Sequence, residues 1–208
     1  MNIPTAKENK RPVKELRDQL RRDQIVSAAR SCVVRHGFHA ASMGQIAAEA
    51  QMSVGQIYRY FPSKEAIVHA IVERIVARRL QWMISHDEPV DFAAILAKRN
   101  LIQSDDQHGD RVLLLEITAE ATRNAAVAEI VREADRRLHA QAEALVKADY
   151  PEISEAEAIV RVELIAVLSE GTAFRHITQQ RADRALLEAL YRKVIGVAFP
   201  EPSQKRTA

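Results

Sequence analysis

Gln56 and Arg59 lie three residues apart in the segment Ser42–Lys64, and both carry side chains that suit base recognition. A glutamine amide matches the hydrogen-bonding edge of adenine, and a guanidinium matches O6 and N7 of guanine. Neither side chain can read a sequence unless a helix carries it into the major groove of DNA. Whether Gln56 and Arg59 can recognise bases therefore depends on the helices that position them.

The segment Ser42–Lys64 predicts two short amphipathic helices. Apolar residues recur twice at i, i+3, i+4 and i+7, as Met43, Ile46, Ala47 and Ala50 and then as Val54, Ile57, Tyr58 and Phe61. Two short helices this close together bury such stripes only by packing against each other and a third helix. This arrangement is the helix-turn-helix, which indicates DNA binding as well as a fold.

The third helix is expected just before this pair, over about Leu16–His36. Its stripe consists of Ile25, Ala28, Ala29, Cys32 and Val33. Gly37 then suits the left-handed position that follows a helix, and Phe38 offers a hydrophobic anchor. Ser42 and Ser53 are the expected N-caps of the two short helices.

The rest of the chain also predicts helices, because it is rich in Ala, Leu, Glu and Arg and contains no strand pattern. The fold class is therefore all-α. A polar break is expected at Ser104–Asp110, and Ser154 and Glu157 have the spacing of a capping box. The expected helices are Lys64–His86, Asp91–Gln103, Arg111–Thr122, Asn124–Asp149, Ser154–His176 and Asp183–Val197.

Composition indicates a soluble globular protein of 208 residues that is 47% hydrophobic and 28% charged. No apolar run approaches the roughly 20 residues that span a bilayer, and the N-terminus lacks the apolar core of a signal peptide. We therefore expect no membrane partner and a cytoplasmic location. The single cysteine, Cys32, falls in an apolar stripe and is predicted to be a buried structural thiol rather than a redox sensor.

Positive charge is concentrated near the N-terminus. Residues 1–64 hold 11 Lys or Arg and 5 Asp or Glu, whereas the remaining residues hold 19 and 23. This asymmetry is expected if the first part contacts phosphates, and a solvated charged face is the alternative. The basic run Lys7–Arg22 is a minor-groove arm, a phosphate tether or a solvated tail. Residues 1–14 and 200–208 are expected to be poorly ordered.

The pattern resembles the TetR family of bacterial transcriptional regulators across Arg22–Ala77. Family members read much like GFHAASMGQIAAEAQMSVGQIYRYFPSKEAIVHAI in this chain. Gln51 departs from the glycine that the family usually has in the turn, at a modest conformational cost. The resemblance implies a basic N-terminal extension (1–20), a helix-turn-helix DNA-binding domain (21–63), a helical effector-binding and dimerisation domain (64–199) and a tail (200–208).

The resemblance also implies that Ser53–Phe61 is the recognition helix. Groove-facing positions in the family match Val54, Gly55, Gln56, Tyr58 and Arg59. Tyr60 and Lys64 match phosphate-contacting positions, and the helix N-terminus at Ser42 and Met43 suits another phosphate. Alternatively, the Tyr58 ring packs in the core while its hydroxyl reaches DNA, and Arg59 and Lys64 are solvated charges. The predicted DNA-binding set is Ser42, Met43, Ser53, Val54, Gly55, Gln56, Tyr58, Arg59, Tyr60 and Lys64.

By the same resemblance, the protein is expected to be a homodimer that binds a palindromic double-stranded DNA operator and a small-molecule effector. The predicted dimer interface consists of Leu186, Leu187, Leu190, Tyr191 and Val194. Candidate ligand-binding residues are Trp82, Met83, Phe92, Glu116, Glu163, Glu170 and Phe174. Core packing is the alternative for the aromatic residues. For Glu163 and Glu170 the alternative is an exposed strip or an ion-paired strip with Arg161 and Arg175.

Motifs of common enzymes are missing from the sequence, which contains no GxxxxGK[ST], GxGxxG, HExxH, GxSxG or CxxC. We therefore predict that the protein is not an enzyme and needs no cofactor. His139 and His176 are too isolated to suggest a metal site. The predicted function is that of a ligand-responsive DNA-binding repressor. The alternatives are a ligand-independent DNA-binding or architectural protein and a small-molecule-binding helical protein.

Overall fold

The computed structural model describes residues 10–84, 105–177 and 182–199, which form helices and no strand. The fold is all-α, as predicted. The helices are α1 (Lys10–Ala40), α2 (Met43–Glu49), α3 (Val54–Tyr60), α4 (Lys64–Ile84), α6 (Asp105–Ala121), α7 (Ala125–Asp149), α8 (Glu155–Ile177) and α9 (Arg184–Ala198). The chain divides into two compact units, one of residues 1–74 and 112–131 and the other of residues 75–111 and 132–208.

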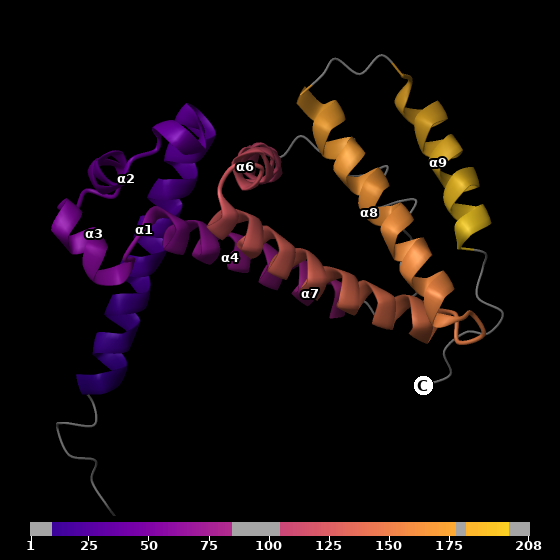
Figure 1. The fold of residues 1–208 in the computed structure, drawn as a ribbon, viewed down its shortest axis with the longest axis horizontal. Coiled ribbons are helices and arrows are strands. Elements are labelled where there is room, and N and C mark those ends of the chain that lie inside the picture. The colour runs from indigo at the N-terminus through magenta and orange to yellow at the C-terminus, as the bar shows by residue number, and fades with distance from the viewer. Residues whose placement is uncertain (1–9, 85–104, 178–181, 200–208) are drawn as a thin grey trace, which may run out of the picture. The chain divides into compact units, whose positions relative to one another are not determined.

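The first unit contains the predicted helix-turn-helix. Helix α1 contacts both α2 and α3, and the two short helices contact each other (Figure 1). Apolar side chains from all three helices are buried together, because helices of seven residues have too little surface to be stable alone. The largest of them are Ile25, Val33, Phe38, Ile46, Ile57 and Phe61.

Both short helices begin at the serines that the sequence predicted. The Ser42 hydroxyl accepts a hydrogen bond from the Gln45 amide at 3.2 Å, and the Gln45 side chain accepts from the Ser42 amide at 2.9 Å. Ser53 and Gln56 repeat this arrangement at the same distances. Each capping box satisfies two amides that the helix itself leaves without partners.

Two positions adopt the positive φ that the sequence analysis expected. Gly37 has φ 80° and ψ 161°, which interrupts α1 near its end and turns the chain toward α2. Gln51 has φ 54° and is the only non-glycine residue with positive φ in the described part of the chain. The prediction that glutamine tolerates the conformation of the usual turn glycine is therefore confirmed.

Some predicted boundaries were wrong. Helix α1 begins at Lys10 rather than near Leu16, so residues 10–14, which were expected to be poorly ordered, are helical. Helix α6 begins at Asp105, so the expected polar break at Ser104–Asp110 is instead the start of a helix. Polar residues do not end a helix when nothing in the backbone prevents hydrogen bonding. The predicted helix Asp91–Gln103 lies outside the described residues.

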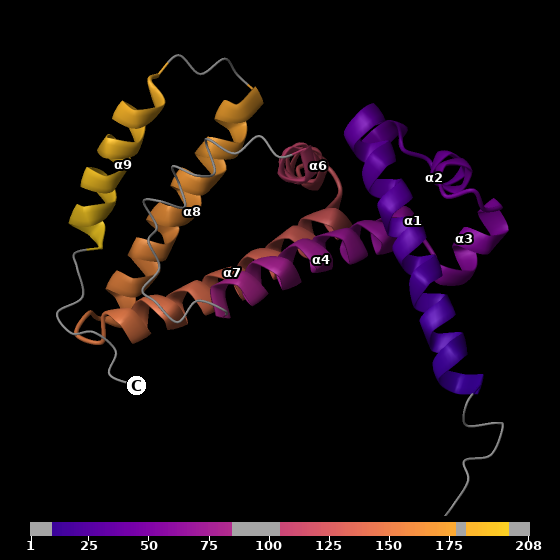
Figure 2. The same cartoon turned by 180° about the vertical axis from the view of Figure 1, so that it is seen from behind.

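In the second unit, α8 and α9 lie side by side and antiparallel, as Figures 1 and 2 both show. The Ser154 capping box predicted from the sequence is present, with the Glu157 carboxylate accepting from the Ser154 amide at 2.9 Å. A buried cluster joins the end of α7 to α8 and α9. Its members are Val146, Tyr150, Ile153, Ala158, Val162, Ile195 and Phe199.

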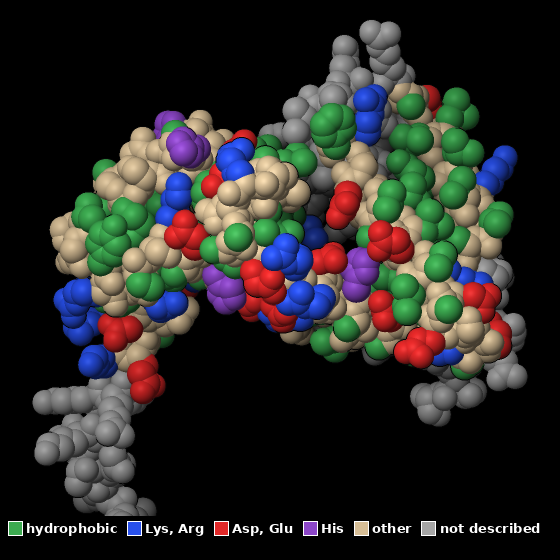
Figure 3. All heavy atoms as spheres, in the orientation of Figure 1, with side chains coloured by type: hydrophobic (Ala, Val, Ile, Leu, Met, Phe, Trp, Pro, Cys, Tyr) green, Lys and Arg blue, Asp and Glu red, His purple; other side chains and the backbone are tan. Residues whose placement is uncertain are grey.

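Several apolar side chains of α8 and α9 are exposed. The exposed residues are Ile159, Val160, Val167 and Phe174 on α8 and Leu186, Leu190, Val194 and Val197 on α9. Figure 3 shows hydrophobic side chains spread over the visible faces of these helices. Among the described helices, none combines the length and apolar character of a membrane-spanning segment.

Candidate nucleic-acid interface

The outer face of α3 is open to solvent. Gly55, Gln56 and Arg59 are all exposed, and a Cβ added at Gly55 would meet no atom within 4 Å. The opposite face is fixed, because Ile57 is fully buried and Phe61 is only 1% exposed. Helix α3 is therefore fixed by its buried face, while its exposed face remains available for contact.

Val54 and Tyr58 belong to this open face and not to the core. The sequence pattern placed both in the buried stripe, but they are 41% and 51% exposed. A helix of two turns packs against its neighbours over a narrow arc, which Ile57 and Phe61 fill. This result removes the interpretation in which the Tyr58 ring packs in the core.

Gln56 is both a capping residue and a candidate base-reading residue. Its side-chain oxygen accepts a hydrogen bond from the Ser53 amide at 2.9 Å, so the carboxamide is folded back on the start of α3. The amide nitrogen of the same group remains a donor, since capping uses only the oxygen. Bidentate pairing with adenine therefore requires the side chain to leave its capping position.

Tyr60 and Lys64, the predicted phosphate contacts, each have a partner within the unit. The Tyr60 hydroxyl donates to the Asp18 carboxylate at 3.4 Å. The Lys64 ammonium donates to the carbonyl oxygen of Phe38 at 2.9 Å and lies 4.2 Å from the centre of the Phe38 ring. An ammonium carries three donors, so this contact leaves others for a phosphate.

Helix α1 supplies positioning residues that the sequence analysis missed. Arg22 Nη1 donates to the carbonyl oxygen of Tyr60 at 2.8 Å, and the guanidinium lies 4.2 Å from the centre of the Phe61 ring. Gln24 Nε2 donates to the carbonyl oxygen of Ala50 at 2.7 Å. These bonds satisfy carbonyls at the C-terminal ends of α3 and α2, which helices leave unpaired. No local sequence pattern marks such contacts, because their partners lie 26 and 38 residues away.

Two further interactions fix α4 within the same unit. Arg74 forms an ion pair with Asp23 of α1. The pKa of Glu65 is lowered by hydrogen bonds from the Glu65 backbone amide and from the side chains of Ser63 and Asn124. Burial opposes this shift but has a smaller effect. A carboxylate in the first turn of α4 also interacts favourably with the helix dipole.

Glu116, a candidate ligand residue, is engaged in the first unit. Its carboxylate accepts a hydrogen bond from the Phe38 amide at 3.0 Å, so it supports the turn after Gly37. This contact joins α6 to the end of α1. The structure therefore gives Glu116 a role in holding the helix-turn-helix, and a ligand contact at Glu116 stays a prediction.

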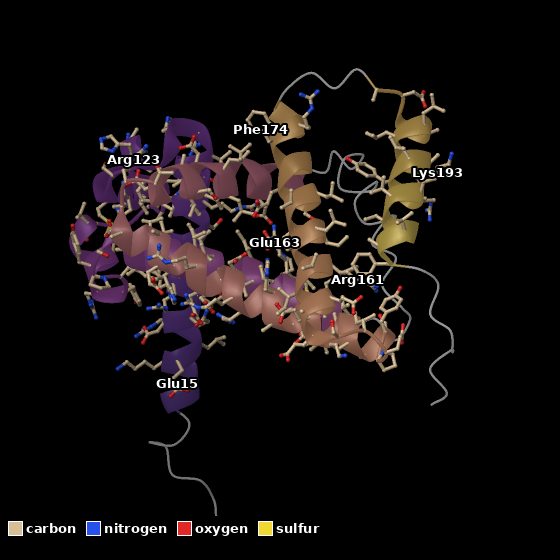
Figure 4. The ribbon with its side chains drawn as sticks, turned by 45° about the vertical axis from the view of Figure 1, so that its right-hand side comes forward. Glu15, Arg123, Arg161, Glu163, Phe174 and Lys193 are labelled. Atoms are coloured by element: carbon tan, nitrogen blue, oxygen red, sulfur yellow. The ribbon has the colours of Figure 1, made fainter. Side chains whose placement is uncertain are left out.

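Of the other ligand candidates, Trp82 and Met83 lie on α4, and Glu163, Glu170 and Phe174 lie on α8. Trp82 is 40% exposed at the end of α4, and Phe92 lies outside the described residues. Glu163 and Phe174 lie at different levels of α8 (Figure 4). Glu163 and Glu170 are both exposed, which agrees with the alternative of an exposed strip, and the carboxylate of Glu163 lies 4.0 Å from His139.

Arg161 takes part in the buried cluster instead of pairing with Glu163. Its guanidinium lies 5.6 Å from the ring centre of Tyr150 and 6.0 Å from that of Phe199. Burial raises the pKa of the Tyr150 hydroxyl, and the negative charge of Asp149 raises it further. These residues hold α7, α8 and α9 together at one end of the second unit.

Cys32 is buried in the first unit, as predicted. Burial raises the pKa of its thiol, and the charge of Glu49 adds to this shift. A thiol that is kept protonated and covered is chemically inert. This result confirms the prediction of a structural cysteine.

Comparison with known proteins agrees with this geometry. Residues 25–71 match the family model described as "Bacterial regulatory proteins, tetR family". The HTH-type transcriptional regulator UidR of Escherichia coli strain K12 is 33% identical over 111 residues, which are 53% of this chain and 57% of UidR. The match therefore spans little more than half of that relative.

Solved structures show the same fold over most of the chain. Salmonella enterica GusR superimposes with a TM-score of 0.68 and 24% identity, covering 84% of this chain and 94% of that one. A transcriptional regulator from Saccharomonospora viridis in complex with choline has a TM-score of 0.65 and 18% identity, covering 84% and 94%.

The helix-turn-helix with an open second helix, on an all-α scaffold, defines the class of DNA-binding transcriptional regulators. The DNA-binding part of the chain matches the TetR family of these regulators. Members of this family are transcriptional regulators and not enzymes, which agrees with the prediction from the sequence.

Proposed function

We propose that the protein is a dimeric repressor that binds an inverted-repeat operator and releases it when a small molecule binds. The observation that carries this proposal is the exposed outer face of α3, with Gly55, Tyr58 and Arg59 in front of a buried Ile57. A rigidly held helix with an open polar face suits insertion into the major groove. Operator binding places the site of action in the cytoplasm, where bacterial DNA lies.

Arg59 is the strongest candidate for base recognition on this face. Its side chain is exposed, and an arginine can pair with guanine through two hydrogen bonds. Gly55, one turn earlier on α3, lets DNA approach the backbone because no side chain stands there. Ser42 and Met43 at the start of α2, together with Tyr60 and Lys64, are proposed to bind phosphates on either side.

The exposed apolar faces of α8 and α9 support dimerisation. Leu190 is 56% exposed and Leu186 is 74% exposed, although both are large apolar side chains on a regular helix. Two helices from each subunit would cover these faces in a four-helix interface. Tyr191 packs against the buried cluster of its own chain, so the outward stripe is Leu186, Leu190 and Val194.

Small-molecule binding is proposed for the second unit. This fold holds choline in the Saccharomonospora viridis regulator, so it can accommodate a small molecule. We propose a hydrophobic or amphipathic effector near Trp82, on the half of α4 that belongs to the second unit. Because α4 begins in the first unit at Lys64, a shift of this helix would reach the DNA-binding part. A coupling of about 1–3 kcal/mol would change operator affinity roughly 5- to 150-fold.

An operator selected from random duplexes by the purified protein tests DNA binding. Arg59→Ala should weaken binding to the selected site by roughly 1–3 kcal/mol and relax the preference at one position of each half-site. Gln56→Glu keeps the capping acceptor but loses the amide donors, so it should change base preference without unfolding α3. Gln45→Glu makes the same change in the capping box of α2 and should leave base preference unchanged.

Lys64→Ala should weaken binding to all sequences and lower the salt dependence by about one ion. If Arg59→Ala, Gln56→Glu and Lys64→Ala lose affinity equally on selected and random DNA, the base-reading residues are misassigned. If none of the three variants loses affinity for DNA, the proposed placement of the interface on α3 is contradicted.

Trp82 is the only tryptophan of the chain, so its fluorescence reports on the second unit. Lipophilic cations, aromatic acids and acyl compounds are the probes. We expect one of them to shift the Trp82 emission and to lower operator affinity. A ligand that binds without affecting DNA affinity would refute the coupling, and binding of none would favour a ligand-independent regulator.

A further inference from the structure

The first turns of α1 carry an excess of positive charge. Residues 10–22 contain six Lys or Arg and only two acidic residues, Glu15 and Asp18. The sequence alone left open whether these charges belong to a DNA-contacting arm or to a solvated tail. In the structure they lie on a helix that begins at Lys10, so their spacing is fixed.

This part of α1 lies beside the C-terminal end of the recognition helix α3. The Tyr60 hydroxyl donates to the Asp18 carboxylate at 3.4 Å, and Arg22 Nη1, one turn later on α1, donates to the Tyr60 carbonyl oxygen at 2.8 Å. From this contact α1 continues past α3 toward its N-terminus (Figure 1). The residues before Asp18 therefore project beyond the recognition helix within the same unit.

Three cations line the projecting part and its base. Lys14 lies one turn before Asp18, on the same side of α1. At Asp18 this side contacts the C-terminal end of α3. Arg17 and Arg21 follow at i+3 and i+7 from Lys14 and form one strip with it. All three side chains are exposed. Figure 3 shows Lys and Arg side chains at this end of α1.

Asp18, the carboxylate that lies within this strip, accepts from the Tyr60 hydroxyl in the described residues. Lys14 and Arg17 form no ion pair there, and Arg21 Nη1 donates at 2.8 Å to the uncharged side chain of Gln24. Exposed cations without acidic partners, held at helical spacing, are suited to rows of phosphates. They do not by themselves carry sequence information.

We propose that Lys14, Arg17 and Arg21 form a second DNA-contacting surface that binds phosphates flanking each half-site, outside the bases read by α3. The inference rests on the proposed operator binding, because Tyr60 and Arg22 attach this surface to the recognition helix. The helix extends the contacted length of DNA and strengthens binding in a sequence-independent way. It therefore raises affinity without changing the base preference of the operator.

The test uses the full chain with Lys14→Gln and Arg17→Gln combined. Both positions are exposed, so circular dichroism and the unfolding temperature should match the wild type. Binding is measured on the selected operator alone and on the operator with one helical turn (about 10 base pairs) of flanking DNA on each side. Arg132→Gln combined with Arg136→Gln on α7 removes the same charge from the second unit and is the matched control.

We expect the Lys14/Arg17 variant to lose roughly 10-fold in affinity on the flanked duplex and the salt slope to fall by about two ions per subunit. On the operator without flanks, and in the control variant, the loss should be much smaller. Lys14→Glu with Arg17→Glu should enlarge the loss on flanked DNA, since repulsion replaces attraction.

Equal affinities of wild type and variant for flanked DNA would overturn the inference while leaving operator binding intact. A loss that depends on the flanking sequence would show base reading and would also overturn it. If the wild type selects no operator at all, the proposed function itself fails, and the flanking contact fails with it.

Discussion

The carboxylate of Glu116 accepts a hydrogen bond from the backbone amide of Phe38 at 3.0 Å, across 78 positions of sequence. The carbonyl oxygen of Phe38 accepts from Lys64 at 2.9 Å, so both polar groups of this peptide backbone are paired by side chains. Helices α6 and α4 thus fix the turn that leads from α1 into α2. This turn sets the position of the helix-turn-helix on the rest of the first unit.

Replacing Glu116 tests the strength of this contact. In Glu116→Ala the Phe38 amide loses its acceptor beside a side chain that is only 1% exposed, which should cost about 1–3 kcal/mol of unfolding free energy. Glu116→Gln retains an oxygen acceptor and should lose less, because a neutral acceptor is weaker than a charged one. Denaturant unfolding measures both, and equal losses would show that the hydrogen bond contributes little.

Gly37 should not tolerate a side chain. Its φ of 80° with ψ of 161° is a region that only glycine occupies readily, and an added Cβ would lie 3.2 Å from Glu116 Oε2. We expect Gly37→Ala to lower the free energy of unfolding by about 2 kcal/mol. Gly55→Ala is the control, since it should stabilise helix α3 by about 0.5–1 kcal/mol. A neutral Gly37→Ala variant in thermal unfolding would contradict this account.

Gln51 is a site where glycine should improve the protein. Its φ of 54° costs a residue with a Cβ about 1 kcal/mol, which glycine avoids. Part of this gain is offset because glycine makes the unfolded chain more flexible. Gln51→Gly should therefore raise stability by up to about 1 kcal/mol, whereas Gln51→Val should lower it by at least that amount. If Gln51→Val is more stable than Gln51→Gly, the backbone strain inferred at Gln51 is refuted.

Because the pKa of Glu65 is lowered, the free energy of unfolding depends on pH in the acidic range. The folded state favours the charged carboxylate through hydrogen bonds from its own amide, Ser63 and Asn124. The resulting stabilisation is present above the ordinary glutamate pKa of about 4.3 and is lost as the pH falls through the lower folded value. Between pH 5 and pH 3, Glu65→Gln should lose less stability than the wild type. Glu15→Gln, at an exposed position of α1, controls for removal of a charge and should follow the wild type.

Leu190→Arg tests the proposed dimer. A charged side chain at this exposed apolar position would be left without a partner in a four-helix interface, so the variant should sediment as a monomer at micromolar concentration. Ala140→Arg, at an exposed position of α7, introduces the same group and should remain dimeric. A monomeric wild type, or a dimeric Leu190→Arg, would remove this face from the interface.

Local patterns in the sequence were enough to predict the helix-turn-helix. Ile46 and Ile57 repeat at helical spacing, and Ser42 and Ser53 stand where a cap is needed, because helix formation and capping depend on residues within a few positions. The positive φ of Gly37 followed from the same local logic, whereas that of Gln51 followed from the family resemblance. The outward position of Val54 and Tyr58 came from the family resemblance and not from the apolar spacing, since that spacing does not show how wide an arc the neighbours cover.

The tertiary structure alone decided which polar residues support this motif. Arg22, Glu116 and Lys64 carry ordinary surface charges in the sequence, yet each pairs with backbone of the first unit in the fold. A long-range hydrogen bond has no periodic signature, because its partner is brought near by the packing of other helices. The sequence thus determined the helices and their caps, while folding selected the side chains that hold them in place.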